Sequence, residues 1–114
     1  MAVPGIRLLS YNEAERNNYH YVIAEIDAAK FGMSRDELKS VLHSHNILAR
    51  RYFFPGCHRM EPYVTLYPEA GRYLRVTEAF CERVIALPNG TQISPDQIEK
   101  ICQLINNIHQ TTQI

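Results

Sequence analysis

The stretch VIALPNG at residues 84–90, followed by SPDQ at residues 94–97, joins a short apolar run to a turn and a helix start. An apolar run of this length before Pro-Asn-Gly predicts a buried β-strand. The serine can cap the next helix, the proline suits its first position, and the glutamine completes a capping box. Apolar residues then recur at helical spacing: Ile98, Ile101, Cys102, Ile105 and Ile108. A strand and an amphipathic helix therefore share one core, and the polar tail from His109 onward is expected to fray.

The rest of the chain alternates between strand and helix patterns. β-Branched and aromatic residues over Tyr19–Ile26 predict one strand, and Ile47–Phe54 predicts another that Pro55 ends. Between them, Ser34 opens a helix with a capping box, and a short helix is expected to start after Thr77. The predicted fold class is α/β (α+β), a small two-layer sandwich with a sheet of about three strands and helices packed on one face.

Length and composition fit a single domain over residues 1–114. The chain has 114 residues and a mass of 13.2 kDa, and 46% of its residues are hydrophobic, which suffices for one compact core. Twelve basic and twelve acidic side chains cancel, so no global field favours nucleic acid or a membrane surface. No apolar run reaches the roughly 18 residues of a membrane span, and the first ten residues lack a secretory signal. We therefore expect a cytoplasmic protein without nucleic-acid or membrane partners.

The three cysteines do not indicate a metal site or a disulfide framework. Cys57, Cys81 and Cys102 are widely spaced, and the sequence has no Cys-x-x-Cys pair. Reduced, mostly buried thiols are expected, and no metal site is predicted.

Residues 50–75 differ in composition from the rest of the chain. This segment holds five of the nine arginines and six of the eleven aromatic residues, with only Glu61 and Glu69 as acids. Guanidinium groups bind phosphate or carboxylate, and flat rings stack on a sugar or a base. Because three prolines interrupt the segment, most of it is expected to lack regular structure. It is either a ligand-contacting loop or an ordinary surface loop.

Several runs of the sequence together resemble one protein family. They are Asn18–Ile23, Ser34–Leu38, Ile47–Tyr63, Val84–Gly90 and Ser94–Ile98. These runs are similar to the C-terminal small domain of the DegT-type sugar-nucleotide aminotransferases, and the block from Arg51 to Tyr63 is the most specific part. The resemblance implies a pyridoxal phosphate-dependent reaction of fold type I. In it, an amino group passes from an amino acid, commonly glutamate, to a keto sugar carried on a nucleoside diphosphate.

The resemblance also implies which residues contact the substrate. In such enzymes this domain walls one side of the active-site cleft, so the partner of the whole enzyme is a nucleotide-linked sugar. The implied substrate-binding residues are Tyr52, Phe53, His58 and Arg59, together with Arg51 and Tyr63. Arg59 suits a phosphate or a carboxylate, while His58 and Tyr52 suit sugar hydroxyls or the carbonyl oxygen. A homodimer or another form of self-association is expected.

The printed sequence does not include the large N-terminal domain that carries the cofactor in this family. A Schiff-base enzyme needs a lysine beside its cofactor. Lys30, Lys39 and Lys100 all lie on polar faces or in a connector. We therefore predict no catalytic residue, no cofactor-binding residue and no bound cofactor in this chain, which is then inactive by itself. Pyridoxal phosphate belongs to the full-length enzyme.

Two other classes of function remain open. A stand-alone binding or dimerisation module without catalytic activity would explain the missing cofactor domain, with Tyr19, Tyr21 and Ile23 at its interface. An RNA-binding sheet is the second, because Arg50–Phe54 places basic and aromatic residues on one strand. The neutral net charge argues against RNA binding.

Overall fold

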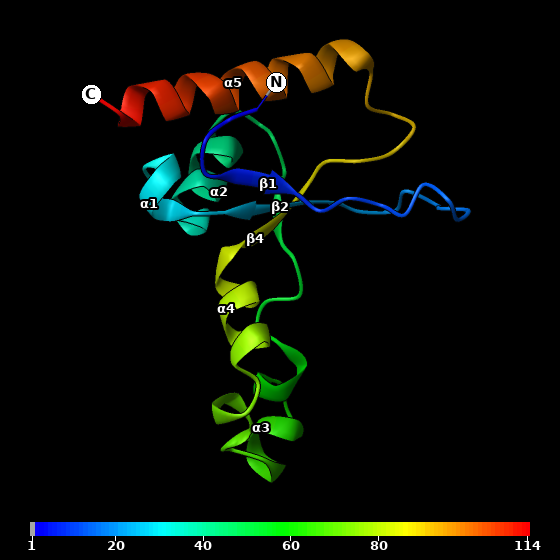
Figure 1. The fold of residues 1–114 in the computed structure, drawn as a ribbon, viewed down its shortest axis with the longest axis vertical. Helices are drawn as coiled ribbons and strands as arrows, with labels where there is room; N and C mark the ends of the chain where they lie inside the picture. The colour runs from blue at the N-terminus through cyan, green and yellow to red at the C-terminus, as the bar shows by residue number, and fades with distance from the viewer. Residues whose placement is uncertain (1) are drawn as a thin grey trace.

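The computed structural model describes residues 2–114, which form a sheet with α5 on one side and a helical projection on the other (Figure 1). The strands are β1 (Ile6–Leu8), β2 (Val22–Ile26), β3 (Arg50–Arg51) and β4 (Val84–Leu87). The α-helices are α1 (Ala28–Phe31), α2 (Arg35–Ser44), α3 (Tyr63–Leu66), α4 (Arg75–Arg83) and α5 (Pro95–Thr112). Two 3-10 turns, Cys57–Arg59 and Ala70–Arg72, lie in the projection.

The four strands form one antiparallel sheet in the order β1-β2-β4-β3. Ala24 of β2 pairs with Leu8 on one side and with Ile85 on the other. The predicted α+β class is confirmed, and the sheet has four strands where about three were expected. β1 escapes prediction because three residues are too few to show a period. Tertiary pairing creates it, and the Asp27 amide extends this pairing by donating to Gly5 O at 2.7 Å.

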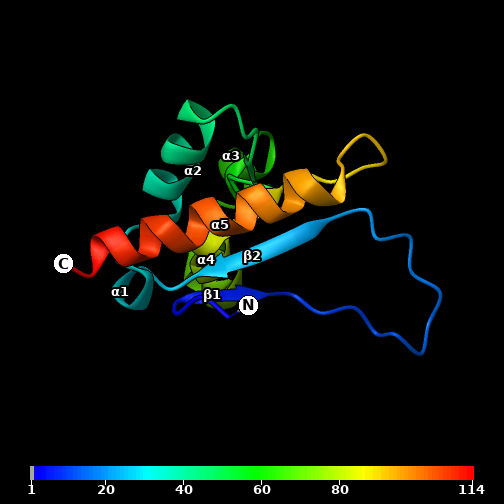
Figure 2. The same ribbon diagram turned by 90° about the horizontal axis from the view of Figure 1, so that it is seen from above.

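Alternate residues of the two central strands face the core. Ala24 of β2 and Ile85 of β4 are buried and belong to one cluster with Leu38 and Leu42 of α2 and Ile105 of α5. On this side α5 runs along β2 (Figure 2). Burial of each large aliphatic side chain stabilises the fold by about 1.5–3 kcal/mol. The sheet and these two helices are the two layers that the sequence pattern predicts.

Two predicted strands are shorter than expected. Tyr19 has a φ of 50°, in the left-handed region, and the first predicted strand begins only at Val22. In the second, only Arg50 and Arg51 pair with β4, and Phe53 turns the chain at a φ of 45°. The aromatic residues that favoured a strand here pack around a turn instead. β4, in contrast, has the predicted bounds.

The two predicted capping boxes are both present. Ser34 Oγ accepts from the Glu37 amide and Ser94 Oγ from the Gln97 amide, each at 3.2 Å, and the side chains of Glu37 and Gln97 bond back to the capping residues. These local bonds fix where α2 and α5 begin. Within residues 2–114, no helix is long and apolar enough to cross a membrane.

The prediction of a frayed C-terminal tail is wrong. α5 continues to Thr112, and both His109 Nδ1 and Thr112 Oγ1 lie 2.9 Å from the carbonyl oxygen of Phe31. The ring of His109 also stacks on that of Phe31, with centroids 5.6 Å apart. The tail is held because α1 ends at this carbonyl, which is a partner distant in sequence.

The projection formed by residues 53–83 is called the arm below, and it extends away from the sheet on the side opposite α5 (Figure 1). It contains α3, α4 and the two 3-10 turns, and within residues 50–75, where mostly irregular structure was predicted, about half of the residues belong to no helix or strand. Short helical turns satisfy the backbone between the prolines. α4 also begins at Arg75 and not after Thr77, since Leu74 O already accepts a helical bond from the Glu78 amide.

Arg35, the first residue of α2, anchors the arm to the sandwich. The residue is 2% exposed, and its NH1 group donates to Cys81 O at 2.8 Å and to Val84 O at 2.7 Å. Its Nε donates to Asp36 at 2.9 Å. The guanidinium therefore binds carbonyl groups at the end of α4, where the arm meets the sheet. A buried arginine is rarely tolerated without such partners.

Candidate functional site

A cavity of about 570 Å³ opens in the arm between the 3-10 turn at Cys57–Arg59, α3 and α4. Its aromatic lining residues are Tyr52, Phe53, Tyr63, Tyr67 and Phe80. His58 also lines it, so the structure brings four of the six predicted substrate-binding residues together: Tyr52, Phe53, His58 and Tyr63. An aromatic cavity with a few polar groups is the usual form of a small-molecule site.

Three aromatic rings at residues 21, 52 and 53 form a connected group. Tyr52 and Phe53 have ring centroids 4.2 Å apart, and Tyr21 of the β1–β2 connection lies 5.3 Å from Tyr52 and 6.1 Å from Phe53. Phe53 is 61% exposed, because its left-handed backbone turns the side chain out of the strand direction. Exposed, flat ring faces of this kind can stack on a sugar or a base.

Glu78 of α4 binds both His58 and Arg59. His58 Nε2 lies 2.5 Å from Glu78 Oε1, and Arg59 Nε donates to the same oxygen at 2.7 Å. A second guanidinium nitrogen of Arg59 bonds to Oε2, so the pair is bidentate. The hydrogen bonds from Arg59 and then from His58 lower the pKa of Glu78 to about 2. The carboxylate is therefore ionised throughout the physiological range and fixes two predicted site residues against α4.

Gly56 leaves the space that His58 occupies. A Cβ at this position would lie 2.7 Å from Cε1 and 2.9 Å from Nδ1 of His58, closer than real Cβ contacts. The His58 side chain is only 9% exposed, so the ring has little room to move away. Gly56 thus admits the imidazole to the cavity wall, whereas the strand has already ended at Arg51.

Arg51 and Arg59 do not line the cavity. Arg51 lies over the ring of Phe54, 4.1 Å from its centroid, and Arg35 approaches the same ring at 5.3 Å. Arg59 points to Glu78, and its side chain remains 55% exposed. The structure therefore separates these two cations from the aromatic group that they accompany in sequence.

Glu78 is the residue that sequence reasoning missed. Residues 50–75 carry five arginines against two acids, and this local excess of positive charge is a signal that counter-charges lie elsewhere in the chain. The next helix carries Glu78 and Glu82. Their spacing from Arg59 along the chain is about twenty residues, so only the tertiary fold decides which of them binds it.

The cysteines are more accessible than expected. Cys57 and Cys102 are exposed and Cys81 is half-buried, so the prediction of mostly buried thiols is wrong, and all three are free. Cys57 and Cys81 both line the arm cavity. Among residues 2–114, no group of three or more His, Cys, Asp or Glu side chains is placed to hold a metal ion.

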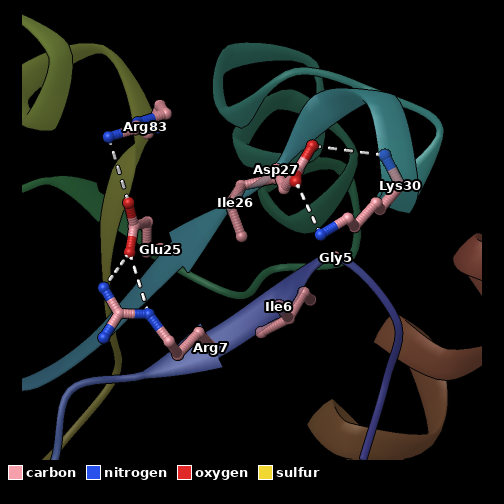
Figure 3. Close-up of a pocket in the computed structure, with 8 residues that line it drawn as sticks. All are labelled: Gly5, Ile6, Arg7, Glu25, Ile26, Asp27, Lys30 and Arg83. Atoms are coloured by element: carbon pink, nitrogen blue, oxygen red, sulfur yellow. Dashed lines mark hydrogen bonds and ion pairs between the residues drawn. The ribbon is translucent and has the colours of Figure 1, made fainter.

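A second cavity, of about 310 Å³, lies beside β1 and β2 and is built around ion pairs (Figure 3). Glu25 binds Arg7 of the neighbouring strand and also Arg83 of α4, the latter at 3.2 Å. Lys30 pairs with Asp27 at 3.5 Å. Arg7 and Arg83 share the single carboxylate of Glu25, so this ion-pair cluster links β1, β2 and α4.

Comparison with known proteins places the chain in a family. Residues 2–106 match the model of the DegT/DnrJ/EryC1/StrS aminotransferase family. The chain belongs to this family. It is 32% identical over 102 residues to a dTDP-4-amino-4,6-dideoxy-D-glucose transaminase of Escherichia coli, and 32% identical over 110 residues to one of Shigella dysenteriae. Among solved structures, it is similar to DesI crystallised in the presence of its TDP-sugar product, with a TM-score of 0.81 and 39% identity.

The aminotransferase match covers this chain almost fully and its relatives only in part. The aligned region is 90% of this chain and 27% of the E. coli protein, 93% and 28% for the Shigella protein, and 93% and 26% for DesI. The chain thus spans about a quarter of the length of these relatives. The predicted resemblance to DegT-type aminotransferases is confirmed.

The DegT family depends on pyridoxal phosphate, and the lysines described here do not fit its attachment. None of Lys30, Lys39 and Lys100 lines the arm cavity. The Lys30 side chain is 74% exposed and paired with Asp27. An attachment lysine must instead lie in a cavity that shields the cofactor from water. No catalytic step is therefore assigned to a lysine of residues 2–114.

Proposed function

We propose that this chain acts as the C-terminal small domain of a sugar-nucleotide aminotransferase and forms one wall of its active-site cleft. The substrate is a nucleotide-linked keto sugar that receives an amino group. One observation carries the proposal: a member of this family gathers Tyr52, Phe53, His58 and Tyr63 around one aromatic cavity. Relatives whose names specify dTDP-sugar chemistry support the substrate class.

The aromatic residues supply the surface on which a sugar or base lies. Phe53 offers a ring face, and Tyr52 and Tyr63 add phenol hydroxyls that donate or accept hydrogen bonds. His58 lies in the same wall, and a ring nitrogen there can orient a sugar hydroxyl or the keto oxygen. The chain's own residues thus bind and orient the sugar, and they exclude water from one side of it.

Arg59 serves the anionic part of the substrate in this proposal. Two of its N–H donors bind Glu78, and the exposed remainder of the guanidinium can bind a phosphate outside the cavity, next to His58 in the chain. Because Glu78 already fixes the side chain, little rotamer entropy is lost when the phosphate binds. Arg51 is the second candidate for that phosphate, although it stacks on Phe54 in this structure.

The cofactor and the catalytic lysine come from the remainder of a longer enzyme in this proposal. The chain corresponds to about a quarter of its relatives, which leaves room for a separate cofactor domain. By itself the chain is inactive, with neither a catalytic residue nor a bound cofactor. Pyridoxal phosphate supplies the electron sink for amino transfer in the complete enzyme.

Exposed apolar side chains support a protein partner for the arm. Large hydrophobic residues of the arm that remain exposed are Phe53, Met60, Tyr63, Leu66, Tyr67, Tyr73, Leu74 and Val76. Such a surface on a small domain is normally covered by another domain or subunit. The cofactor domain, or a second copy in a homodimer, covers it in the proposed assembly.

The test is a chimera in which this chain replaces the matching quarter of the E. coli transaminase. We expect the chimera to aminate its dTDP-sugar, and Arg59→Ala to lower kcat/KM for the sugar nucleotide by about tenfold to a hundredfold, since charge-assisted bonds contribute about 1.5–3 kcal/mol. His58→Ala should lower kcat as well as raise KM if the imidazole orients the reacting carbonyl.

The two half-reactions provide the control. Pre-steady-state measurement separates the amino-donor step from the sugar step, and both substitutions should affect the sugar step more. Lys39→Ala, on α2 and outside the cavity lining, should leave both unchanged. Sugar turnover that is normal in both variants would show that this loop is only a scaffold and would refute the proposal.

A further inference from the structure

A third cavity, of about 230 Å³, lies between the β1–β2 connection and the residue that follows β3, and it is called the connection cavity below. Its lining residues are Leu9, Ser10, Tyr11, Asn18, His20, Tyr21, Ile23 and Tyr52. Tyr52 also lines the arm cavity, so both cavities border on this residue. The proposed sugar contacts use none of the other seven residues.

The rings of the connection cavity touch one another but do not stack face to face. The ring centroid of Tyr21 lies 5.3 Å from that of Tyr52 and 4.3 Å from that of His20. The rings of these two pairs are inclined by 65° and 63°. In such edge-to-face pairs, one ring keeps both of its faces uncovered by the other. Tyr21 is 41% exposed, so a flat ligand can reach these faces from solvent.

The same wall carries polar groups that are free to bind a ligand. The Tyr11 hydroxyl donates to Tyr21 O, and Asn18 Oδ1 accepts from the His20 amide at 3.1 Å, so these two bonds shape the wall. The amide nitrogen of Asn18 and the hydroxyls of Tyr21 and Tyr52 have no hydrogen-bond partner among residues 2–114. The cavity therefore combines ring faces with N–H and O–H groups.

A distant residue holds the connection in this arrangement. Asn89, which follows β4, donates from Nδ2 to Tyr19 O at 2.5 Å and to His20 O at 3.1 Å. Tyr19 has a φ of 50°, and its ring lies against Tyr11, with centroids 5.0 Å apart, outside the cavity lining. A tyrosine in the left-handed region costs energy, and residues held in this way cluster at binding sites. The turn at Tyr19 places the following His20 and Tyr21 in the cavity wall.

The size of the connection cavity and its mixed wall indicate the class of ligand. Pockets for drug-sized ligands measure roughly 300–1,000 Å³, so a cavity of about 230 Å³ suits a single ring and not a whole nucleotide. A purely apolar ring would leave the amide and hydroxyl groups of the wall without partners. A pyrimidine base has flat faces for stacking, and its edge carries carbonyl acceptors and a ring N–H donor.

We propose that the connection cavity binds a pyrimidine base. Its ring lies against Tyr21 and Tyr52, and one of its carbonyl oxygens accepts a hydrogen bond from the Asn18 amide nitrogen. Because Tyr52 borders both cavities, a base here and a sugar in the arm cavity can belong to one ligand. Only that assignment, of the ring to the base of the sugar nucleotide, rests on the proposed function. Binding of a pyrimidine nucleoside is a property of this chain and is measured without any amino transfer.

The test titrates the folded chain with thymidine and follows its backbone amides by NMR. Thymidine carries the base without a phosphate or a keto sugar, so failure of the proposed reaction leaves its result unaffected. We expect saturable shifts at Ser10, Tyr11, Asn18, His20, Tyr21 and Tyr52, and none there with deoxyribose 5-phosphate. Adenosine, whose base has two fused rings, should bind at least about tenfold more weakly. Thymidine that causes no saturable shift, or adenosine that binds as tightly as thymidine, would overturn the proposal.

The stacking contact is tested by removing one ring. Tyr21→Ala should weaken thymidine binding by at least about fivefold, since base–aromatic stacking contributes about 1–3 kcal/mol per base. The Tyr11 bond to Tyr21 O involves the backbone and persists in this variant. Tyr73→Ala is the matched control, because Tyr73 is 84% exposed and lines neither cavity, and it should keep the wild-type affinity. Equal thymidine affinities in the two variants would refute stacking on Tyr21.

The polar contact is tested by a substitution that preserves the local structure. Asn18→Asp keeps the oxygen that accepts from the His20 amide and loses only the N–H donor. It should weaken thymidine binding by about threefold or more, as expected when one hydrogen bond is lost. The amide spectrum of β2 should stay unchanged, which shows that the sheet is intact. Wild-type affinity for thymidine in this variant would remove Asn18 from the site.

Discussion

The sandwich, residues 2–52 and 84–114, and the arm, residues 53–83, are stabilised in different ways. All ten buried hydrophobic residues of the described chain lie in the sandwich, where β2, β4, α2 and α5 meet. In the arm, Gly56 alone is buried, while eight of the fourteen exposed large hydrophobic residues of the described chain are there. The sandwich therefore buries its large apolar side chains, whereas the arm leaves many of its own exposed to solvent.

This difference explains where the candidate site lies. An apolar core holds the sandwich together, and polar contacts there mainly fix the ends of its helices. The arm instead relies on Arg35 at its base and on Glu78 between His58 and Arg59, so its own apolar side chains remain available to a ligand or a partner. Binding residues are commonly found on such segments, held in place by a scaffold.

The largest expected effect comes from the sandwich core. Leu42→Ala should lower the free energy of unfolding by about 2–5 kcal/mol, because Leu42 is fully buried in the central cluster. Leu66→Ala in the arm removes the same atoms from a side chain that is 63% exposed and should change it by less than about 0.5 kcal/mol. Urea unfolding of both variants measures the contrast, and equal losses would contradict it.

The next effect concerns the joint between the two regions. Arg35→Leu should cost about 2–3 kcal/mol, since the carbonyls of Cys81 and Val84 lose a buried donor. Hydrogen exchange of backbone amides should speed up in α4 and much less in α5. A uniform change across the chain would mean that the arm and the sandwich unfold as one unit.

A smaller effect is expected from acid. The folded-state pKa of Glu78 is about 2 and its ordinary value is 4.5, so the contribution of this carboxylate is complete above pH 4.5 and is lost as the pH falls toward 2. Glu78→Gln should lower the stability at neutral pH, where the contribution is complete, and remove the part of the pH dependence that falls between pH 4.5 and 2. Thermal unfolding of both proteins from pH 2 to 7 tests this, with Glu82→Gln as the control.

The smallest effect on stability should come from the outer surface of the arm. Tyr73 and Val76 are 84% and 83% exposed, so changing both to lysine should alter the unfolding free energy by less than about 0.5 kcal/mol. The same change should reduce self-association, because it interrupts the apolar surface. Sedimentation velocity at high concentration compares the self-association of the variant with that of the wild-type chain. A wild-type chain that remains monomeric there would show that this surface does not self-associate.

Local sequence patterns predicted the features whose causes are local. The capping boxes at Ser34 and Ser94 form between residues three positions apart, and the apolar run of β4 needs only burial to become a strand. The family resemblance then picked out the block from Arg51 to Tyr63, and four of the six site residues drawn from it line one cavity.

Features that depend on distant partners could not be predicted in this way. The interface proposed from Tyr19, Tyr21 and Ile23 is one example, since Ile23 is buried at 6% exposure while Tyr19 and Tyr21 remain partly exposed. The turn before β2, where Tyr19 leaves the extended conformation, separates the two exposed tyrosines from the buried Ile23.

By itself, then, the sequence determined the α+β class, the starts of α2 and α5, and membership of an aminotransferase family, because short-range hydrogen bonds and apolar periodicity carry that information. Only the tertiary structure decided that β1 joins the sheet, that the tail of α5 is held by Phe31, and that Glu78 binds His58 and Arg59. Each of these contacts joins residues sixteen or more positions apart, and no local pattern of residues specifies which distant groups will meet.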